Sequence, residues 1–198
     1  MVYTPKKMIK KIRRLLIAPF FLFALGAPSW SAEQHQGTVE LFLGHYDIKD
    51  PRFREVYLTG GPIRGIVLSS ALAYGLEFYS EIKAFYKVGA LTYTKEETKF
   101  LLLPLSLGLR YAPPWPYLIP YAGAGLDVYF SYETNPIAKT LNVSKGTHVL
   151  AGLYLQFSRT FPVRLNGKVK YSWVTATEND IALELGGLEY GGGIAIVF

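Results

Sequence analysis

Strict period-two alternation constrains the fold of this chain more than any other feature. The clearest case is segment 101–111, in which every second residue is large and apolar: Leu101, Leu103, Leu105, Leu107, Leu109 and Tyr111. A strand gathers such residues on one face, whereas a helix would scatter them around its circumference. Beyond residue 32, no apolar stretch reaches the length of a membrane-spanning helix. The pattern therefore predicts an all-β protein.

The same alternation predicts eight strands, each of about ten to fifteen residues. Their ranges are 37–47, 66–79, 82–94, 98–111, 119–132, 146–158, 163–175 and 183–198. The expected connections on one side are 48–65, 95–97, 133–145 and 176–182, and those on the other side are Ser80–Glu81, Ala112–Leu118 and Arg159–Pro162. An even number of strands returns both termini to one side, so the prediction is an eight-stranded antiparallel up-and-down transmembrane β-barrel.

A soluble barrel with its leucines inside is the alternative to a membrane barrel. In a soluble barrel the face opposite the apolar row meets water and is rich in charge. Here that face is mostly Gly, Ala, Ser and Tyr, and its glycines include Gly108, Gly123, Gly125, Gly152, Gly191 and Gly193. Small residues suit the crowded inside of a narrow barrel, so the membrane barrel is favoured.

The N-terminal segment has the three parts of a cleavable signal peptide. Basic residues come first, at Lys6, Lys7, Lys10, Lys11, Arg13 and Arg14. An apolar stretch of about twelve residues, 15–26, precedes the small residues of 29–32. This stretch is too short for an uncleaved transmembrane anchor. We therefore expect a signal peptide over 1–32, cut after Ser31 or Ala32, and a barrel domain over 33–198.

Removal of the leader changes the charge of the protein. The whole chain has 21 basic and 15 acidic residues, and the six ionisable residues of the leader are all basic, which leaves 15 of each in the mature chain. The high isoelectric point therefore belongs to the leader and gives no reason to expect nucleic-acid binding. The chain has no cysteine, which excludes thiolate chemistry, and no metal-ligand spacing. We expect no cofactor and no metal.

Two segments and the C-terminus resemble a known family. The segments 103–111 (LPLSLGLRY) and 120–129 (PYAGAGLDVY) are similar to the fourth and fifth strands of small eight-stranded outer-membrane β-barrels, such as the OmpA transmembrane domain and OmpW-like proteins. Gly193, Ile196 and Phe198 match the C-terminal assembly signal of that family, although Gly191 replaces its usual polar residue and Ile196 is not aromatic. The resemblance implies outer-membrane location, contact with membrane lipid and lipopolysaccharide, recognition by the barrel assembly machinery, and a monomer.

The parity of the strands predicts a polar cluster inside the barrel. Its members are Glu40, Glu77, Lys83, Lys87, Arg110, Asp127, Lys168, Lys170 and Glu189, and the same face carries His148, Gln156 and Arg164. A turn about Ser80 would place Glu77 across from Lys83, and a turn near Asn179 would place Glu189 diagonal to Lys168 and Lys170. These charges could line a conduit or form an ion-paired plug. Eight strands leave room for little more than side chains, which favours the plug.

Catalysis is the third function to consider, because some small outer-membrane barrels modify lipid A. The deacylases among them carry a His-x-Ser pair on a late strand, which supplies a nucleophile and its base. The corresponding stretch here, 168–174, contains Ser172 but no histidine, and the three histidines are His35, His45 and His148. We therefore expect a non-enzymatic barrel with a structural, adhesive or loop-mediated binding role. A narrow channel for small solutes and a lipid A-modifying enzyme are the alternatives.

The leader and the terminal strand generate the first testable prediction. Residues 1 to about 31 should be missing from the mature protein, because the leader has a cleavage region. Deletion of Phe198 should lower the yield of assembled barrel. The intact mass of the protein from the outer-membrane fraction checks the first part, and full-length protein in the inner membrane with Met1 retained would contradict it.

Overall fold

The structure is a computed structural model, and it describes residues 37–90, 97–136, 139–158, 161–178 and 181–198. The predicted signal peptide, both candidate cleavage sites, His35 and the expected turn at Asn179 lie outside the described residues. Within the described ranges, no helix is long and apolar enough to span a membrane.

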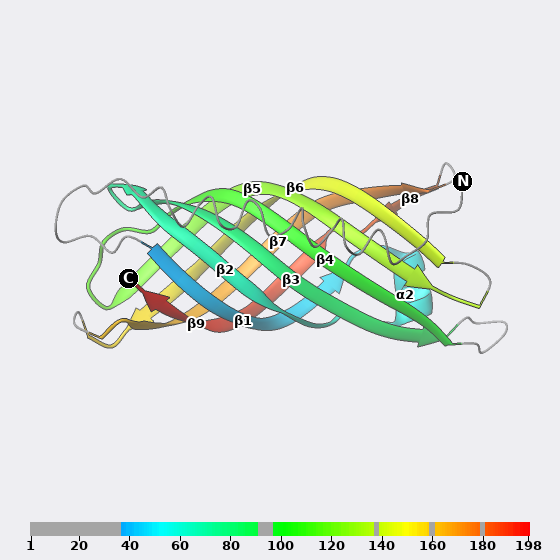
Figure 1. Cartoon of the computed structure of the whole chain (residues 1–198), viewed down its shortest axis with the longest axis horizontal. Coiled ribbons are helices and arrows are strands. Elements are labelled where there is room, and N and C mark those ends of the chain that lie inside the picture. Colours follow the sequence, from blue (N-terminus) through cyan, green and yellow to red (C-terminus); the bar gives the residue numbers. More distant parts are fainter. Residues whose placement is uncertain (1–36, 91–96, 137–138, 159–160, 179–180) are drawn as a thin grey trace, which may run out of the picture. The chain divides into compact units, whose positions relative to one another are not determined.

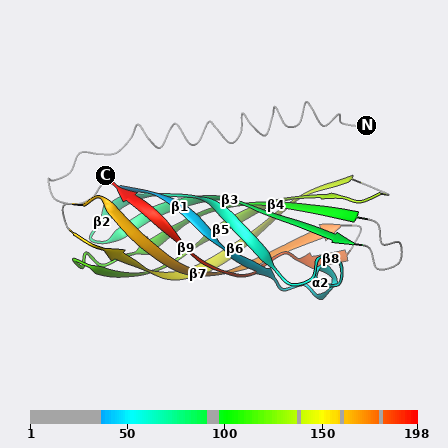
Figure 2. The ribbon, with the colours of Figure 1, turned by 90° about the horizontal axis from the view of Figure 1, so that it is seen from below.

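The strands form one closed antiparallel barrel (Figures 1 and 2). The elements are β1 (Gly37–Ile48), α2 (Pro51–Tyr57), β2 (Gly61–Ala73), β3 (Leu76–Ala90), β4 (Glu97–Tyr111), β5 (Leu118–Thr134), β6 (Lys139–Gln156), β7 (Val163–Glu178), β8 (Ile181–Glu184) and β9 (Gly187–Val197). Each strand from β1 to β7 pairs with the next, and β9 pairs with both β7 and β1. The short β8 pairs with β7 alone, so the wall has eight strands. The predicted fold class is confirmed.

The two ends of the barrel differ. At the end that we call the termini end, the Gly37 and Phe198 backbones exchange two hydrogen bonds of 3.0 and 3.1 Å. At this end β2, β4 and β6 finish and β3, β5 and β7 begin. Helix α2 lies at the opposite end, which we call the loop end (Figure 1). The position of a residue along its strand therefore indicates how far it lies from each end of the barrel.

The first hairpin turn is not where the sequence analysis placed it. The turn between β2 and β3 is formed by Tyr74 and Gly75, at φ 49° and φ 83°, and not by Ser80–Glu81. Two consecutive residues with positive φ make the tight turn that matches the twist of paired strands. Tyr74 is rarely found in this conformation, which is why the sequence did not mark the turn. The second strand consequently begins at Gly61, inside the predicted outer connection.

Other boundaries also differ at the loop end. The predicted connection 133–145 is mostly strand, since β5 extends to Thr134 and β6 starts at Lys139. The predicted last strand, 183–198, is divided into β8 and β9 by Leu185 and Gly186. Antiparallel pairing extends these hairpins beyond the apolar segments that the alternation detects.

Side chains alternate between an apolar outer face and a polar inner face. Leu43, Leu126 and Ile196 point outward and are 69%, 64% and 55% exposed, whereas Glu81, Lys83 and Lys168 point inward and are buried. A soluble barrel would have the reverse arrangement. The outer face therefore has the character of a lipid-facing surface.

The outer face yields the second prediction. Leu107 lies near the middle of the apolar outward row 101–111 of β4, between Ser80 and Leu126, and is 53% exposed. Leu107→Arg should destabilise the barrel in lipid by about 2 to 4 kcal/mol, because it puts a cation near the membrane midplane. Thr134→Arg, on the same face at the loop end of β5, should cost at most about 1 kcal/mol. Urea titration of both variants in liposomes tests the difference, and equal costs would mean that this face does not contact lipid.

Candidate functional site

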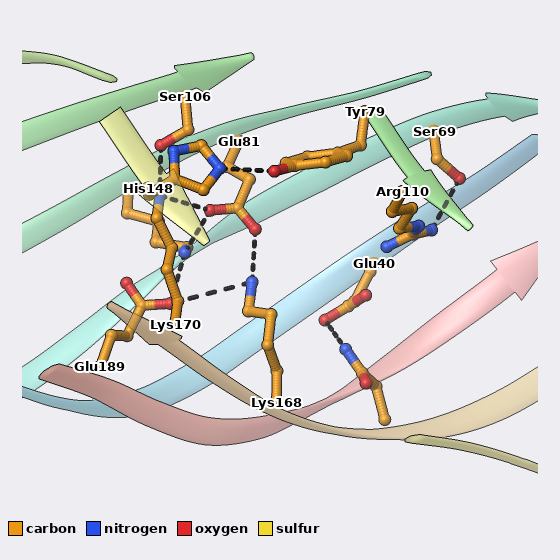
Figure 3. A network of polar contacts seen from close by, with 12 residues as sticks. Glu40, Ser69, Tyr79, Glu81, Ser106, Arg110, His148, Lys168, Lys170 and Glu189 are labelled. Atoms are coloured by element: carbon orange, nitrogen blue, oxygen red, sulfur yellow. Dashed lines mark hydrogen bonds and ion pairs between the residues drawn. The ribbon is translucent and has the colours of Figure 1, made fainter. Parts of the chain in front are cut away.

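Glu81 occupies the centre of a charged network inside the barrel (Figure 3). It projects inward from β3 and is 2% exposed. One carboxylate oxygen accepts hydrogen bonds from Lys83 at 2.6 Å and from Lys170 at 3.2 Å, and the other accepts from Lys168. A buried carboxylate is stabilised only when such partners replace the water that it loses. Glu81 therefore joins β3 to β7 across the lumen.

Glu189 and Lys170 are direct partners in the register of β7 and β9, but they do not form an ion pair. Glu189 accepts from Lys83 at 2.5 Å and lies 3.8 Å from Lys168. The Lys170 ammonium instead contacts Glu81, donates to the Ser106 hydroxyl at 2.5 Å and lies 3.1 Å from Asp127. The structure thus brings Glu189 and Lys168 together as expected and directs Lys170 to other partners.

Asp127, His148 and Tyr79 continue the network toward the termini end. The Ser106 hydroxyl donates to Asp127 at 2.6 Å, and the same carboxylate lies 2.9 Å from Nδ1 of His148. Nε2 of His148 is hydrogen bonded to the Tyr79 hydroxyl. Two glycines make room for these rings. A Cβ atom at Gly108 would lie 2.5 Å from the Tyr79 hydroxyl, and one at Gly125 would lie 2.8 Å from the imidazole.

A second polar group lies nearer the termini end and is centred on Arg110. Its guanidinium donates to Glu77 at 2.6 Å and to Ser69 at 3.0 Å. It also lies over the rings of Tyr121 and Tyr154, at 5.1 and 5.2 Å from their centroids. These contacts combine charge pairing with cation–π attraction, which strengthens when water is excluded.

Glu40 and Arg164 complete this second group through neutral partners. Glu40 accepts from Asn166 at 2.5 Å and from the Tyr154 hydroxyl at 3.1 Å. The Arg164 guanidinium donates to the Gln156 side chain at 2.9 Å. Neutral donors and acceptors therefore satisfy the charges that have no opposite charge beside them.

An apolar plug fills the lumen at the loop end. Phe53 of α2 stacks on Tyr57, with 4.7 Å between ring centroids, and meets Phe100 of β4 edge-on at 5.0 Å. The Tyr57 hydroxyl is hydrogen bonded to Thr98 at 2.9 Å. Burial raises the pKa of this hydroxyl, so Tyr57 stays neutral under physiological conditions.

Asp50 holds the plug helix in place. One oxygen of its carboxylate caps α2 by accepting from the Arg52 amide at 2.8 Å, and the other accepts from the Glu184 amide of β8 at 2.9 Å. An N-cap aspartate satisfies the free amides at a helix start. Here the same side chain also fastens the helix to the barrel wall.

Most of the predicted interior residues are inward-facing and buried: Glu40, Lys83, Arg110, Asp127, Lys168, Lys170 and Glu189. Glu77 is partly exposed at the end of the Arg110 group, and Lys87 faces inward near the loop end without an ion pair to a described residue. The expected Glu77–Lys83 pair is wrong, because both residues lie on β3 once the turn is at Tyr74–Gly75.

The central residue Glu81 was missed for the same reason. It was assigned to a turn, whereas it belongs to the inward-facing series Glu77, Tyr79, Glu81 and Lys83. Alternation counted onward from Tyr74–Gly75 would have found it. Of the predicted assembly signal, Gly193 faces inward, and Ile196 and Phe198 are exposed at 55% and 65%.

Charge within the two interior groups is balanced. The inward acids in these two groups are Glu40, Glu77, Glu81, Asp127 and Glu189, and the inward permanent cations are Lys83, Arg110, Arg164, Lys168 and Lys170. Among the described residues, no three His, Asp or Glu side chains are arranged to hold a metal ion. The geometry is that of a neutral, cross-linked interior.

Comparison with known proteins identifies the fold. Neisserial surface protein A has a TM-score of 0.64 and 17% identity, with 82% of this chain and 97% of that chain covered. OprG from Pseudomonas aeruginosa has a TM-score of 0.62 and 12% identity, with coverages of 85% and 99%. Ail, the attachment invasion locus protein of Yersinia pestis, has a TM-score of 0.51 and 10% identity, with coverages of 82% and 99%.

No family model and no curated protein sequence matches the chain. At such low identities the structural likeness concerns the fold. It confirms the predicted resemblance to small outer-membrane barrels, with the strand number and topology that the alternation indicated.

The network yields the third prediction. Glu81→Gln should destabilise the barrel by about 3 to 5 kcal/mol, because it leaves three buried lysines without their shared carboxylate. Adding Lys168→Met should recover part of that loss. Folding titrations of the two single variants and the double variant measure the coupling, and a value below about 0.5 kcal/mol would exclude a shared network. Glu97→Gln is the control, since its exposed pair with Lys99 should be worth at most about 1 kcal/mol.

Proposed function

We propose that the protein is an integral outer-membrane barrel that acts through its loop end and its outer surface, not through its lumen. The interior carries the proposal. The ion-paired network around Glu81 and the aromatic plug of α2 occupy successive levels of the barrel. A barrel of eight strands has an inside that side chains can fill. Solutes would have to break buried ion pairs to pass.

The outer-membrane location is supported by the fold and by the outer face. Of the similar solved structures, OprG is by title an outer-membrane protein and neisserial surface protein A a surface protein. Barrels of this kind keep short turns in the periplasm and longer loops outside. The termini end is accordingly the periplasmic one, and α2 is extracellular. The proposal includes a signal peptide over 1–32 and assembly through Gly193, Ile196 and Phe198. It also includes a monomeric state in which lipid and lipopolysaccharide surround the barrel.

A structural or adhesive role fits a closed barrel best. Asp50 fixes the plug helix, so α2 is held in a defined position at the loop end. Ail, one of the similar structures, is by title an attachment protein. The interior polar cluster is proposed here to stabilise the barrel and hold this surface, without a catalytic task. Within that cluster, His148 is hydrogen bonded to Tyr79, and Ser106 is hydrogen bonded to Asp127.

Conductance measurements test the closed lumen and form the fourth prediction. The purified barrel in planar bilayers should show no stable current steps above the lipid background, because the network and the plug block the lumen. The OprG barrel, measured under the same conditions, provides a comparison protein of the same fold. Stable ohmic steps that disappear in Glu81→Leu would overturn the proposal in favour of a channel.

Catalysis is tested separately. Mass spectra of lipid A from cells with and without the protein should be identical if the barrel is not an enzyme. A new deacylated or modified species that requires His148 or Ser172 would favour the lipid-modifying alternative.

A further inference from the structure

The charged side chains on the outer face of the strands are confined to the loop end. Among the described residues they are Asp47, Arg64, Glu97, Lys99, Lys139, Lys145 and Glu184. From Arg64 toward the termini end, the outward residues of β1, β2 and β3 are uncharged. The two leaflets that the barrel spans therefore meet different surfaces.

Arg64 is the innermost outward charge on the wall formed by β1 to β4. It lies opposite Leu43 of β1 and Ala84 of β3. On β1, Asp47 lies four residues beyond Leu43 toward the loop end. On β3, Val88 lies four residues beyond Ala84 in the same direction, and it pairs with Lys99 of β4. An exposed guanidinium at this depth lies at the boundary between the lipid acyl chains and the lipid head groups. A cationic side chain is stable there if its charged end reaches a polar partner.

Arg64 has no acidic partner among the residues that the structure describes. Within the described residues it forms no ion pair and no hydrogen bond, although it is exposed. The nearest outward acids are already occupied, since Asp47 pairs with Arg54 at 3.2 Å and Glu97 with Lys99 at 3.1 Å. None of the described acids pairs with Arg64, so its guanidinium is available to an anion from outside the chain.

Amphipathic rings flank Arg64 on both sides. On β1, His45 is opposite Pro62, one outward position from Arg64, and its ring packs against Tyr190 of β9 with 5.4 Å between centroids. On β3, Tyr86 is the next outward residue beyond Ala84 and is 50% exposed. Diagonal neighbours of this kind lie within reach of one ligand. The imidazole and the phenol add hydrogen-bond donors beside the guanidinium.

We infer that Arg64, His45 and Tyr86 form a site for the phosphate group of an anionic lipid in the outer leaflet, as in the phosphorylated glucosamine head group of lipopolysaccharide. The inference rests on the proposed outer-membrane location. Charge complementarity selects this occupant, because an unpaired arginine faces the leaflet that carries phosphates and the fork of its donors matches a phosphate. The site assigns a role to His45, which has no part in the interior network.

The test uses the full mature barrel in phosphatidylcholine nanodiscs containing either bisphosphorylated or dephosphorylated lipid A. Native mass spectrometry counts the lipid A molecules that stay bound. Wild type should prefer the phosphorylated form, and Arg64→Gln should lower that preference about fivefold, as expected for one cation at an anionic surface. Arg64→Lys should keep most of it, whereas His45→Gln and Tyr86→Phe should each lower it less.

Arg54→Gln is the matched control, because Arg54 is a loop-end cation that is already paired with Asp47. Its lipid preference should equal that of wild type. Equal retention of both lipids by wild type, or an unchanged preference in Arg64→Gln, would overturn the site. Competition by inorganic phosphate at millimolar concentration would also overturn it, by showing a site for the free ion. Heat-modifiability on gels reports insertion separately, so a failure of the barrel proposal is distinguishable from a failure of this site.

Discussion

The buried charge network around Glu81 is the interaction on which the rest of the interior depends. Closing eight strands brings inward side chains from opposite walls into contact, and there is little water to solvate them. A carboxylate in that position needs cations at hydrogen-bond distance, and Glu81 has three. Because these lysines come from β3 and β7, the network connects walls that are not neighbours in the sheet. The balance of inward acids and cations follows from the same requirement.

Glycine and tyrosine on the inner face are consequences of this crowding. The glycines opposite Tyr79 and His148 leave the volume that the two rings fill. Tyrosines then fill space and also make polar contacts. The Tyr154 hydroxyl donates to Glu40, and the Arg110 guanidinium lies over the Tyr154 ring. At the loop end, beyond the two charged groups, the aromatic side chains of α2 fill the lumen. The lumen is thus closed by two different means along its length.

The outer face follows a separate rule, set by the membrane. Its large apolar side chains are more exposed than those on a surface that contacts water. On β1 to β4, Arg64 is the outward charged residue that lies farthest from the loop end. Asp47 and Glu97 at the loop end are paired with nearby cations, while Arg64 has no ion pair with a described residue. The paired charges therefore stabilise the loop end, whereas Arg64 is available to lipid. The two faces of one strand therefore contact different environments, the polar lumen and the lipid. Alternation of polar and apolar residues suits β2 and β3 to both.

Alternation in the sequence was sufficient for the fold class, the strand number and the lipid-facing rows, because each of these depends only on period two and on total length. It also placed Lys168, Lys170, Asp127 and Glu189 on the inner face, since parity is a local property. Ion-pair partners were not accessible in this way. Glu77 pairs with Arg110, and Lys170 pairs with Glu81 and Asp127 and not with Glu189, its register partner.

Two physical causes account for what the sequence left undetermined. The tight turn at Tyr74–Gly75 lacks the usual asparagine or aspartate, so only the folded backbone reveals that Glu81 lies on the inner face of β3. Long lysine side chains also reach across the lumen, where their choice of partner depends on the shear and closure of the whole barrel. Local pattern therefore determined which face each residue occupies, and only the closed tertiary structure decided which residues meet, because contacts across the lumen join positions that no strand or hairpin relates.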